Sequence, residues 1–182
     1  MKKHLSYVLL ALVALSAACN SASNNSGDNA STSDSTEKTS TNFPFTKEKG
    51  RDWEINKDDA NTLIALNALK AIENKDYQAI SNSTADSVKS DIDGLKFSGT
   101  KAQMMQANKD FFATLKNIKI VPHDWVSVIN RDKSQEWVSV WYSQYWEDQK
   151  GKKDSLNVFN DIRLKNGKII EWDEFIQHFP KP

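Results

Sequence analysis

The chain of 182 residues has one cysteine, Cys19, so no disulfide bond can form within it. It also lacks an excess of either charge, because 24 lysine and arginine residues balance 24 aspartate and glutamate residues. A nearly neutral chain lacks the basic footprint of nucleic-acid-binding proteins, so nucleic acid is not an expected partner. No GxSxG, P-loop or GxGxxG motif occurs. The sequence therefore does not support assigning the chain to the serine hydrolases, nucleoside triphosphatases or dinucleotide-dependent enzymes.

Histidine is scarce as well, with three residues in the chain. His123 and His178 belong to no HExxH or HxH cluster, so we expect no metal site, and no other cofactor is indicated. His123 follows Pro122 and precedes Asp124. A hydrogen-bonded or surface histidine is the usual explanation for such a residue, and a base that contacts a ligand in a pocket is the alternative.

The long hydrophobic run of the chain lies at its start. Lys2 and Lys3 precede the mostly apolar residues 5–15, a run too short for a membrane-spanning helix, which needs about 20 apolar residues. Small residues follow, so residues 1–18 are predicted to be an export signal. The stretch LSAAC resembles the lipobox of bacterial lipoproteins, in which the cysteine is lipidated and the signal is cut just before it. An ordinary signal with a chance cysteine is the alternative.

The lipobox resemblance implies that Cys19 anchors the chain to a membrane of the bacterial cell envelope, facing the periplasm or at the outer membrane. Residues 19–42 consist largely of Ser, Asn, Thr, Asp and Gly and contain no large apolar residue. Such a segment cannot bury enough surface to offset the entropy of ordering, so we expect a disordered tether. Residues 43–182 hold all six tryptophans and have the size of one domain.

Two longer helices and a shorter one are predicted in the first half of this domain. After a lead-in, residues 58–76 carry apolar side chains at three- and four-residue spacing, which indicates an amphipathic helix. Residues 76–80 predict a short helix or turn. A further helix is expected from Thr100, a plausible N-cap, to about Lys116. Between these helices, a weak edge strand at residues 86–92 is expected to turn back into a short strand.

The hydrophobic period then changes to two. Strands are predicted at residues 118–129, 135–146, 155–164 and 168–176, and the connections between them carry turn-forming residues. Asn166-Gly167 is the strongest hairpin signal in the chain. Helices followed by a meander of long antiparallel strands predict an α+β domain.

This order of elements resembles the NTF2-like superfamily, also called SnoaL-like or ketosteroid-isomerase-like. The residues that carry the resemblance are NTLIALNALKAIENKDY, GTKAQ and NDIRLKNGKIIEWDEF, and it covers about residues 58–179. It implies a cone in which a curved antiparallel sheet wraps around about three N-terminal helices and encloses a pocket. It also implies a homodimer formed through the outer face of the sheet.

The strand at residues 135–146 is apolar on both faces. One row holds Trp137, Ser139, Trp141, Ser143 and Tyr145. The other row holds Val138, Val140, Tyr142, Gln144 and Trp146. Because side chains alternate along a strand, both faces of the sheet are expected to be covered.

The sequence does not decide which row faces inward. Trp141 and Tyr145, or Tyr142, could therefore contact a ligand, since small-molecule pockets combine aromatic walls with a few polar groups. The alternatives are that one row is core and the other a dimer interface, or that the rings form an exposed platform for a sugar.

Two carboxylates are candidate bases. Glu174 shares the apolar row of the last strand with Trp172, a further candidate ligand contact. Apolar surroundings raise the pKa of a carboxyl group and suit it to acid–base work near neutral pH. A solvent-facing acid near the strand end is the alternative. Asp161 is the second candidate base, and a surface pair with Arg163 is its alternative.

In members that resemble limonene epoxide hydrolase, an aspartate near the position of Glu174 pairs with an arginine and a second aspartate. VSVWYSQYW contains no Arg-x-Asp counterpart, which argues against epoxide hydrolysis.

Two functions therefore compete. The first is non-catalytic binding of a small hydrophobic molecule or a protein partner, favoured because no complete catalytic constellation is visible. The second is a SnoaL-like isomerase, cyclase or hydratase with Glu174 or Asp161 as its base. An acid inside the pocket near a tyrosine or histidine would indicate the enzyme.

Overall fold

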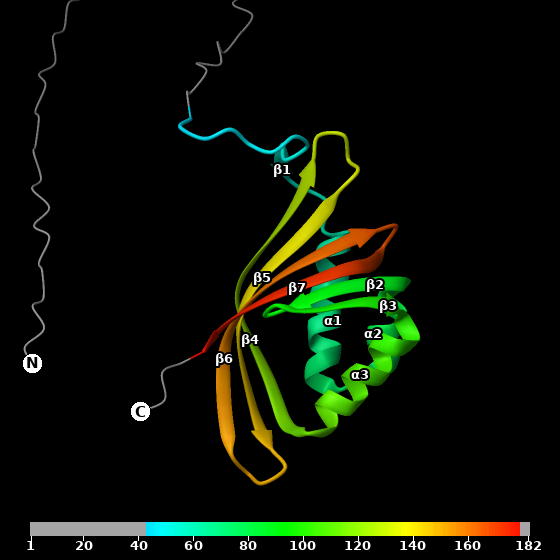
Figure 1. The fold of residues 1–182 in the computed structure, drawn as a ribbon, viewed down its shortest axis with the longest axis vertical. Helices are drawn as coiled ribbons and strands as arrows, with labels where there is room; N and C mark the ends of the chain where they lie inside the picture. Colours follow the sequence, from blue (N-terminus) through cyan, green and yellow to red (C-terminus); the bar gives the residue numbers. More distant parts are fainter. Residues whose placement is uncertain (1–42, 179–182) are drawn as a thin grey trace, which may run out of the picture. The chain divides into compact units, whose positions relative to one another are not determined.

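A computed structural model describes residues 43–178, while the predicted signal, Cys19 and the tether lie outside them. Residues from Phe45 onward belong to one compact unit. The elements, drawn in Figure 1, are β1 (Trp53–Ile55), α1 (Ala60–Asn74), α2 (Tyr77–Ser83), β2 (Thr84–Ile92), β3 (Leu95–Thr100), α3 (Lys101–Ala113), β4 (Leu115–Asn130), β5 (Glu136–Asp148), β6 (Lys153–Lys165) and β7 (Lys168–His178). None of these helices combines the length and the apolar composition needed to cross a membrane.

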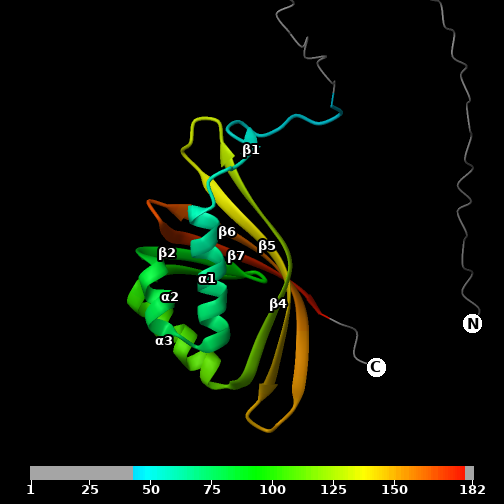
Figure 2. The ribbon, with the colours of Figure 1, turned by 180° about the vertical axis from the view of Figure 1, so that it is seen from behind.

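One sheet contains the seven described strands, in the order β1-β4-β5-β6-β7-β2-β3. Figures 1 and 2 show that the sheet is strongly curved and that α1, α2 and α3 all lie on its concave side. The predicted α+β cone of helices and curved sheet is therefore confirmed.

The sheet differs from the expectation in one pairing, because β2 runs parallel to β7 while the other neighbours are antiparallel. β2 and β7 are separated in sequence by α3 and four strands, so no hairpin dictates their relative direction. The strand predicted at the sheet edge over residues 86–92 is also interior, between β7 and β3.

The turn chemistry behaves as the sequence predicts. Asn166 and Gly167 have φ values of 51° and 69° at the β6–β7 turn, and Asp93 and Gly94 have φ values of 49° and 87° at the β2–β3 turn. Two consecutive residues in the left-handed region are the mark of the type I′ hairpin.

Helix α1 packs on the sheet through small side chains. Ala65 and Ala68 are 0% and 2% exposed and contact a core that includes Val138 and Ile162. Alanine lets the helix approach the strands closely. Leu63, which the spacing places on the apolar face, is 57% exposed instead.

A bulge in β7 decides which of its side chains face the helices. The β6–β7 register shifts between Arg163 and Leu164, and Leu164 pairs with Ile169. Ile169 is therefore buried beside Trp172 on the inner face, where simple alternation had placed Ile170. The extra residue explains the difference, because each bulge reverses the alternation beyond it.

Candidate functional site

A cavity of about 330 Å³ lies between the concave face of the sheet and the helices. Its volume falls near the lower end of the range for small-molecule sites, roughly 300–1,000 Å³. The wall is mainly apolar and draws on all three helices and on β2, β4, β5, β6 and β7. The lining residues on the helices and β2 include Ala68, Ile72, Ile80, Ile92, Met104, Asn108, Phe111 and Phe112. Those on the later strands include Tyr142, Gln144, Trp146, Leu156, Ile169, Trp172, Glu174 and Ile176.

The structure settles which row of β5 faces inward. Tyr142, Gln144 and Trp146 line the cavity, and Val138 and Val140 continue their row into the core against α1. The row stays on this one face because β5 keeps one register with β6 over its paired length, with no bulge to reverse the alternation.

Glu174 places a carboxyl group in the wall of this cavity. Tyr142, Trp172 and Asn160 form hydrogen bonds with it from three adjacent strands. With the Asn160 amide oriented so that donors meet acceptors, its NH₂ group donates to Oε2 of Glu174 over 3.0 Å. The amide oxygen accepts from Trp172 Nε1 (3.2 Å) and lies 3.0 Å from the Tyr142 hydroxyl.

The apolar surroundings change the proton affinity of this group. Burial raises the pKa of Glu174 from 4.5 to about 7, and the hydrogen bonds from Trp172, Tyr142 and Asn160 limit the rise. Asp93 adds a smaller increase through its like charge. The same burial, together with the nearby Glu174 carboxylate, raises the pKa of Tyr142 well above 10, so that Tyr142 stays neutral. Glu174 can therefore exchange a proton near neutral pH.

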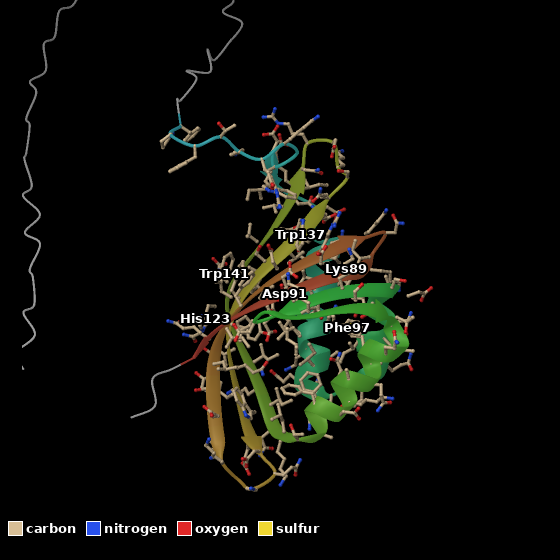
Figure 3. All side chains as sticks on the ribbon, viewed as in Figure 1. Lys89, Asp91, Phe97, His123, Trp137 and Trp141 are labelled. Carbon is tan, nitrogen blue, oxygen red and sulfur yellow. The ribbon has the colours of Figure 1, made fainter. Side chains whose placement is uncertain are left out.

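The structure divides the predicted site residues between two faces. Tyr142, Trp172 and Glu174 come together at the cavity. Trp141 and His123 lie on the face away from the helices, as Figure 3 shows. Tyr145 is in the same β5 row as Trp141 and is 47% exposed. The side chain of His178 is outside the described part.

The outer face carries a stack of aromatic rings across three strands. The ring of Phe159 lies 5.0 Å from that of Trp141 and 5.8 Å from that of Phe175. The planes of neighbouring rings are inclined by 41° and 33°, so the three rings do not share one plane. A flat platform for a sugar is not formed by this stack.

Asp161 also lies on the outer face, where it accepts a hydrogen bond from Ser139 over 2.6 Å and faces Asp173 on β7. Arg163 pairs with Glu171 (3.2 Å), so the sequence-based alternative of an Asp161–Arg163 pair is not what forms. Burial, followed by the like charges of Glu171, Asp91 and Asp161, raises the pKa of Asp173. Among residues 43–178, no group of His, Cys, Asp and Glu is arranged to hold a metal ion.

Sequence reasoning missed Asn160, which joins three residues of the site and is 0% exposed. A signal was present, because Asn160 interrupts the apolar row formed by Val158, Ile162 and Leu164 on β6. A lone amide in such a row must find hydrogen-bond partners when it is buried.

The sequence matches no protein-family model, and no curated protein emerges as its relative. Solved structures do resemble the fold. An LEH-like epoxide hydrolase of M. tuberculosis has a TM-score of 0.54 and 13% identity, over 65% of this chain and 83% of its own. A putative SnoaL-like polyketide cyclase of Shewanella putrefaciens has a TM-score of 0.53 and 10% identity, over 64% of this chain and 79% of its own.

A putative ketosteroid isomerase of Kribbella flavida has a TM-score of 0.51 and 10% identity, over 68% of this chain and 82% of its own. The domain therefore has the NTF2-like fold, and the predicted resemblance is confirmed at that level. Because one fold hosts both enzymes and binding proteins, function has to be argued from the cavity.

Proposed function

We propose that this NTF2-like domain binds a small, largely apolar molecule in the cavity, with Glu174 as its polar anchor. The observation that carries the proposal is the position of this one carboxyl group in a mainly apolar wall. Ligand sites commonly pair extensive apolar contact with a few convergent polar groups. Gln144 and Asn108 add two further hydrogen-bonding side chains to the wall and can orient a ligand.

Filling the cavity tests this proposal. Leu156→Trp enlarges a partly buried wall residue of β6. Ser155→Trp places the same ring on the preceding residue, which faces the other side of the sheet. Titration with a neutral aromatic hydrocarbon, followed by quenching of tryptophan fluorescence, should show saturable binding to the wild type and to Ser155→Trp. Leu156→Trp should bind at least about tenfold more weakly. Equal binding by all three proteins would place the ligand elsewhere.

A second candidate is acid–base catalysis of the isomerase, cyclase or hydratase type. It is favoured because Glu174 lies in the cavity wall in contact with Tyr142, and an acid beside a tyrosine is the arrangement expected of the enzyme. A carboxyl group with a pKa of about 7 is also matched to proton transfer at neutral pH. Glu174 would take a proton from the bound molecule, and the amide of Gln144 could donate a hydrogen bond to the charge that develops.

Deuterium exchange tests catalysis without a known substrate. A small apolar ketone dissolved in D₂O should exchange its acidic hydrogens faster with wild-type protein than with Glu174→Gln. The rate should rise with pH through about 7, because the base has to be ionised. A wild-type rate equal to that of Glu174→Gln leaves non-catalytic binding as the function.

We further propose that the lipid expected on Cys19 holds the domain at a membrane of the cell envelope and that two copies associate through the outer face. Support for the anchor comes from the LSAAC stretch alone. Cys19→Ser should move the protein from the membrane fraction to the soluble fraction of its host. If the variant still sediments with membranes, the lipid is not the anchor.

A further inference from the structure

The electrostatic character of the cavity is one-sided. Among the described residues that line it, Glu174 is the one that carries a charge near neutral pH, and no lysine, arginine or histidine accompanies it. Tyr142 stays neutral because its pKa lies well above its ordinary value. The cavity therefore offers a ligand one negative charge and no positive charge.

The groups that act most strongly on Glu174 are neutral or negative. Tyr142 from β5, Asn160 from β6 and Trp172 from β7 supply neutral donors. Asp93, at the β2–β3 turn, has a charge of the same sign as Glu174. Buried charges in proteins are usually paired with an opposite charge, because neutral donors replace only part of the lost hydration. Within residues 43–178, the lining of the cavity provides no such cation.

Aromatic rings surround the space beside this carboxylate. Phe111, Phe112, Tyr142, Trp146 and Trp172 all line the cavity. The face of an aromatic ring is electronegative and attracts ammonium groups, by about 2 kcal/mol when the cation is desolvated. The wall therefore suits a cation next to Glu174 and a hydrocarbon body beyond it.

We propose that the ligand of this cavity is a hydrophobic amine, bound as its ammonium ion against Glu174 with its apolar body along the helices. This inference rests on the proposed binding function and names the chemical class of the ligand. A carboxylic acid or a phosphate would place a like charge beside Glu174. An alcohol would donate a hydrogen bond to the carboxylate but would leave it without a counter-charge. A ketone only accepts hydrogen bonds, so it would form none with the ionised carboxylate.

Binding of an amine is coupled to the proton of Glu174. A nearby cation favours the ionised carboxylate, so the amine displaces whatever proton the group carries. Glu174 is about half protonated at neutral pH, and binding there should release roughly half a proton. Affinity should rise from about pH 5.5 to about pH 8 as the free site loses its proton, and fall once the amine itself deprotonates.

Calorimetry with matched probes tests the inference on the full chain. Phenylbutylamine and phenylbutanol share one hydrocarbon body and differ in the charged group. At about pH 8 the amine should bind at least about tenfold more tightly than the alcohol. Titrations in two buffers of different ionisation enthalpy should reveal the released proton at neutral pH.

Two variants locate the effect. Glu174→Gln keeps the shape of the side chain and should abolish the preference for the amine. Glu171→Gln makes the same change on the outer side of β7, next to Arg163, and should retain the preference. Circular dichroism of both variants verifies that they fold.

The outcomes distinguish failure of the amine inference from failure of the proposed small-molecule binding. If the alcohol binds wild-type protein as tightly as the amine, or if Glu174→Gln keeps the preference, the amine inference is wrong and small-molecule binding stands. If neither probe nor a neutral hydrocarbon binds, both proposals fail.

Discussion

Glu174 is the residue on which the account of this site depends. The sequence places Glu174 on the apolar row of the last strand, but this pattern is the same for a cavity wall, a packed core and a solvent-facing edge. The surroundings of Glu174 depend on contacts between strands that are distant in sequence, because Tyr142 and Asn160 reach it from β5 and β6. Asp161 had an equally suggestive sequence context and lies on the other face.

The raised pKa of Glu174 predicts a pH-dependent stability. In the unfolded chain the carboxyl group ionises near pH 4.5, whereas in the folded protein it ionises near 7. The unfolded state is therefore favoured progressively between these values, by roughly 3 kcal/mol in total. The group's stabilising contribution is fully present below pH 4.5 and is lost as the pH rises through 7.

Urea unfolding of wild type and Glu174→Gln at several pH values measures this effect. The free energy of unfolding of the wild type, relative to the variant, should fall by roughly 3 kcal/mol from about pH 4.5 to about pH 8. Glu171→Gln provides the outer-face control and should keep most of this fall, with a smaller change because the pKa of Asp173 is lowered when the charge of Glu171 is removed. A constant difference across this range would mean that Glu174 titrates as an ordinary carboxyl group.

The hydrogen bond from Asn160 lowers the pKa of Glu174. Asn160→Ala removes a donor to the carboxylate and one of the two acceptors of Trp172 Nε1, so it should cost about 1–3 kcal/mol of stability. It should also raise the pKa of Glu174 further, because a hydrogen bond that favours the ionised form is lost. A ¹³C NMR titration reads the pKa, with Asn157→Ala on the outer face of β6 as the control. An unchanged Glu174 titration would contradict the hydrogen-bond assignment.

At the scale of elements, local chemistry made most boundaries predictable. Asn166-Gly167 and Asp93-Gly94 form the expected turns because few other residue pairs adopt positive φ twice in succession. The parallel pairing of β2 with β7 and the bulge at Ile170 could not be predicted, since both depend on which distant strand becomes the neighbour.

The start of α3 was also predictable, and its N-cap should make a measurable contribution to the free energy of unfolding. Thr100 accepts a hydrogen bond from the Gln103 amide (3.3 Å), and the Gln103 side chain accepts one from the Thr100 amide (2.9 Å). Thr100→Ala should reduce the free energy of unfolding by about 1 kcal/mol, as for other lost N-caps. Ser98→Ala, two residues earlier in an exposed position, should change it by less than about 0.5 kcal/mol. Equal effects of the two variants would show that the cap contributes nothing.

At the scale of the whole molecule, the unexplained feature is the outer face of the sheet. Phe175 and Trp141 are 59% and 39% exposed at the two ends of the aromatic stack. The sequence-based expectation of a homodimer through this face remains a prediction. A stable dimer would bury about 800 Å² on each copy.

Phe175→Asp should convert that dimer to a monomer, because it puts a charge at the more exposed end of the aromatic stack. Sedimentation equilibrium of the full chain in mild detergent should give the dimer mass for the wild type and the monomer mass for the variant. Leu95→Asp, at an apolar residue 77% exposed beside the β2–β3 turn, should remain dimeric. A monomeric wild type would assign the aromatic stack to a different partner.

Native mass spectrometry of the full chain, purified gently from its own host, tests the central claim that the cavity holds a small molecule. The wild type should carry an adduct of one small mass per copy, and Leu156→Trp, with its cavity filled, should carry none. Fragmentation of the released adduct would then identify the ligand and show whether it contains an amine. A bare wild-type mass, or the same adduct on Leu156→Trp, would contradict the account.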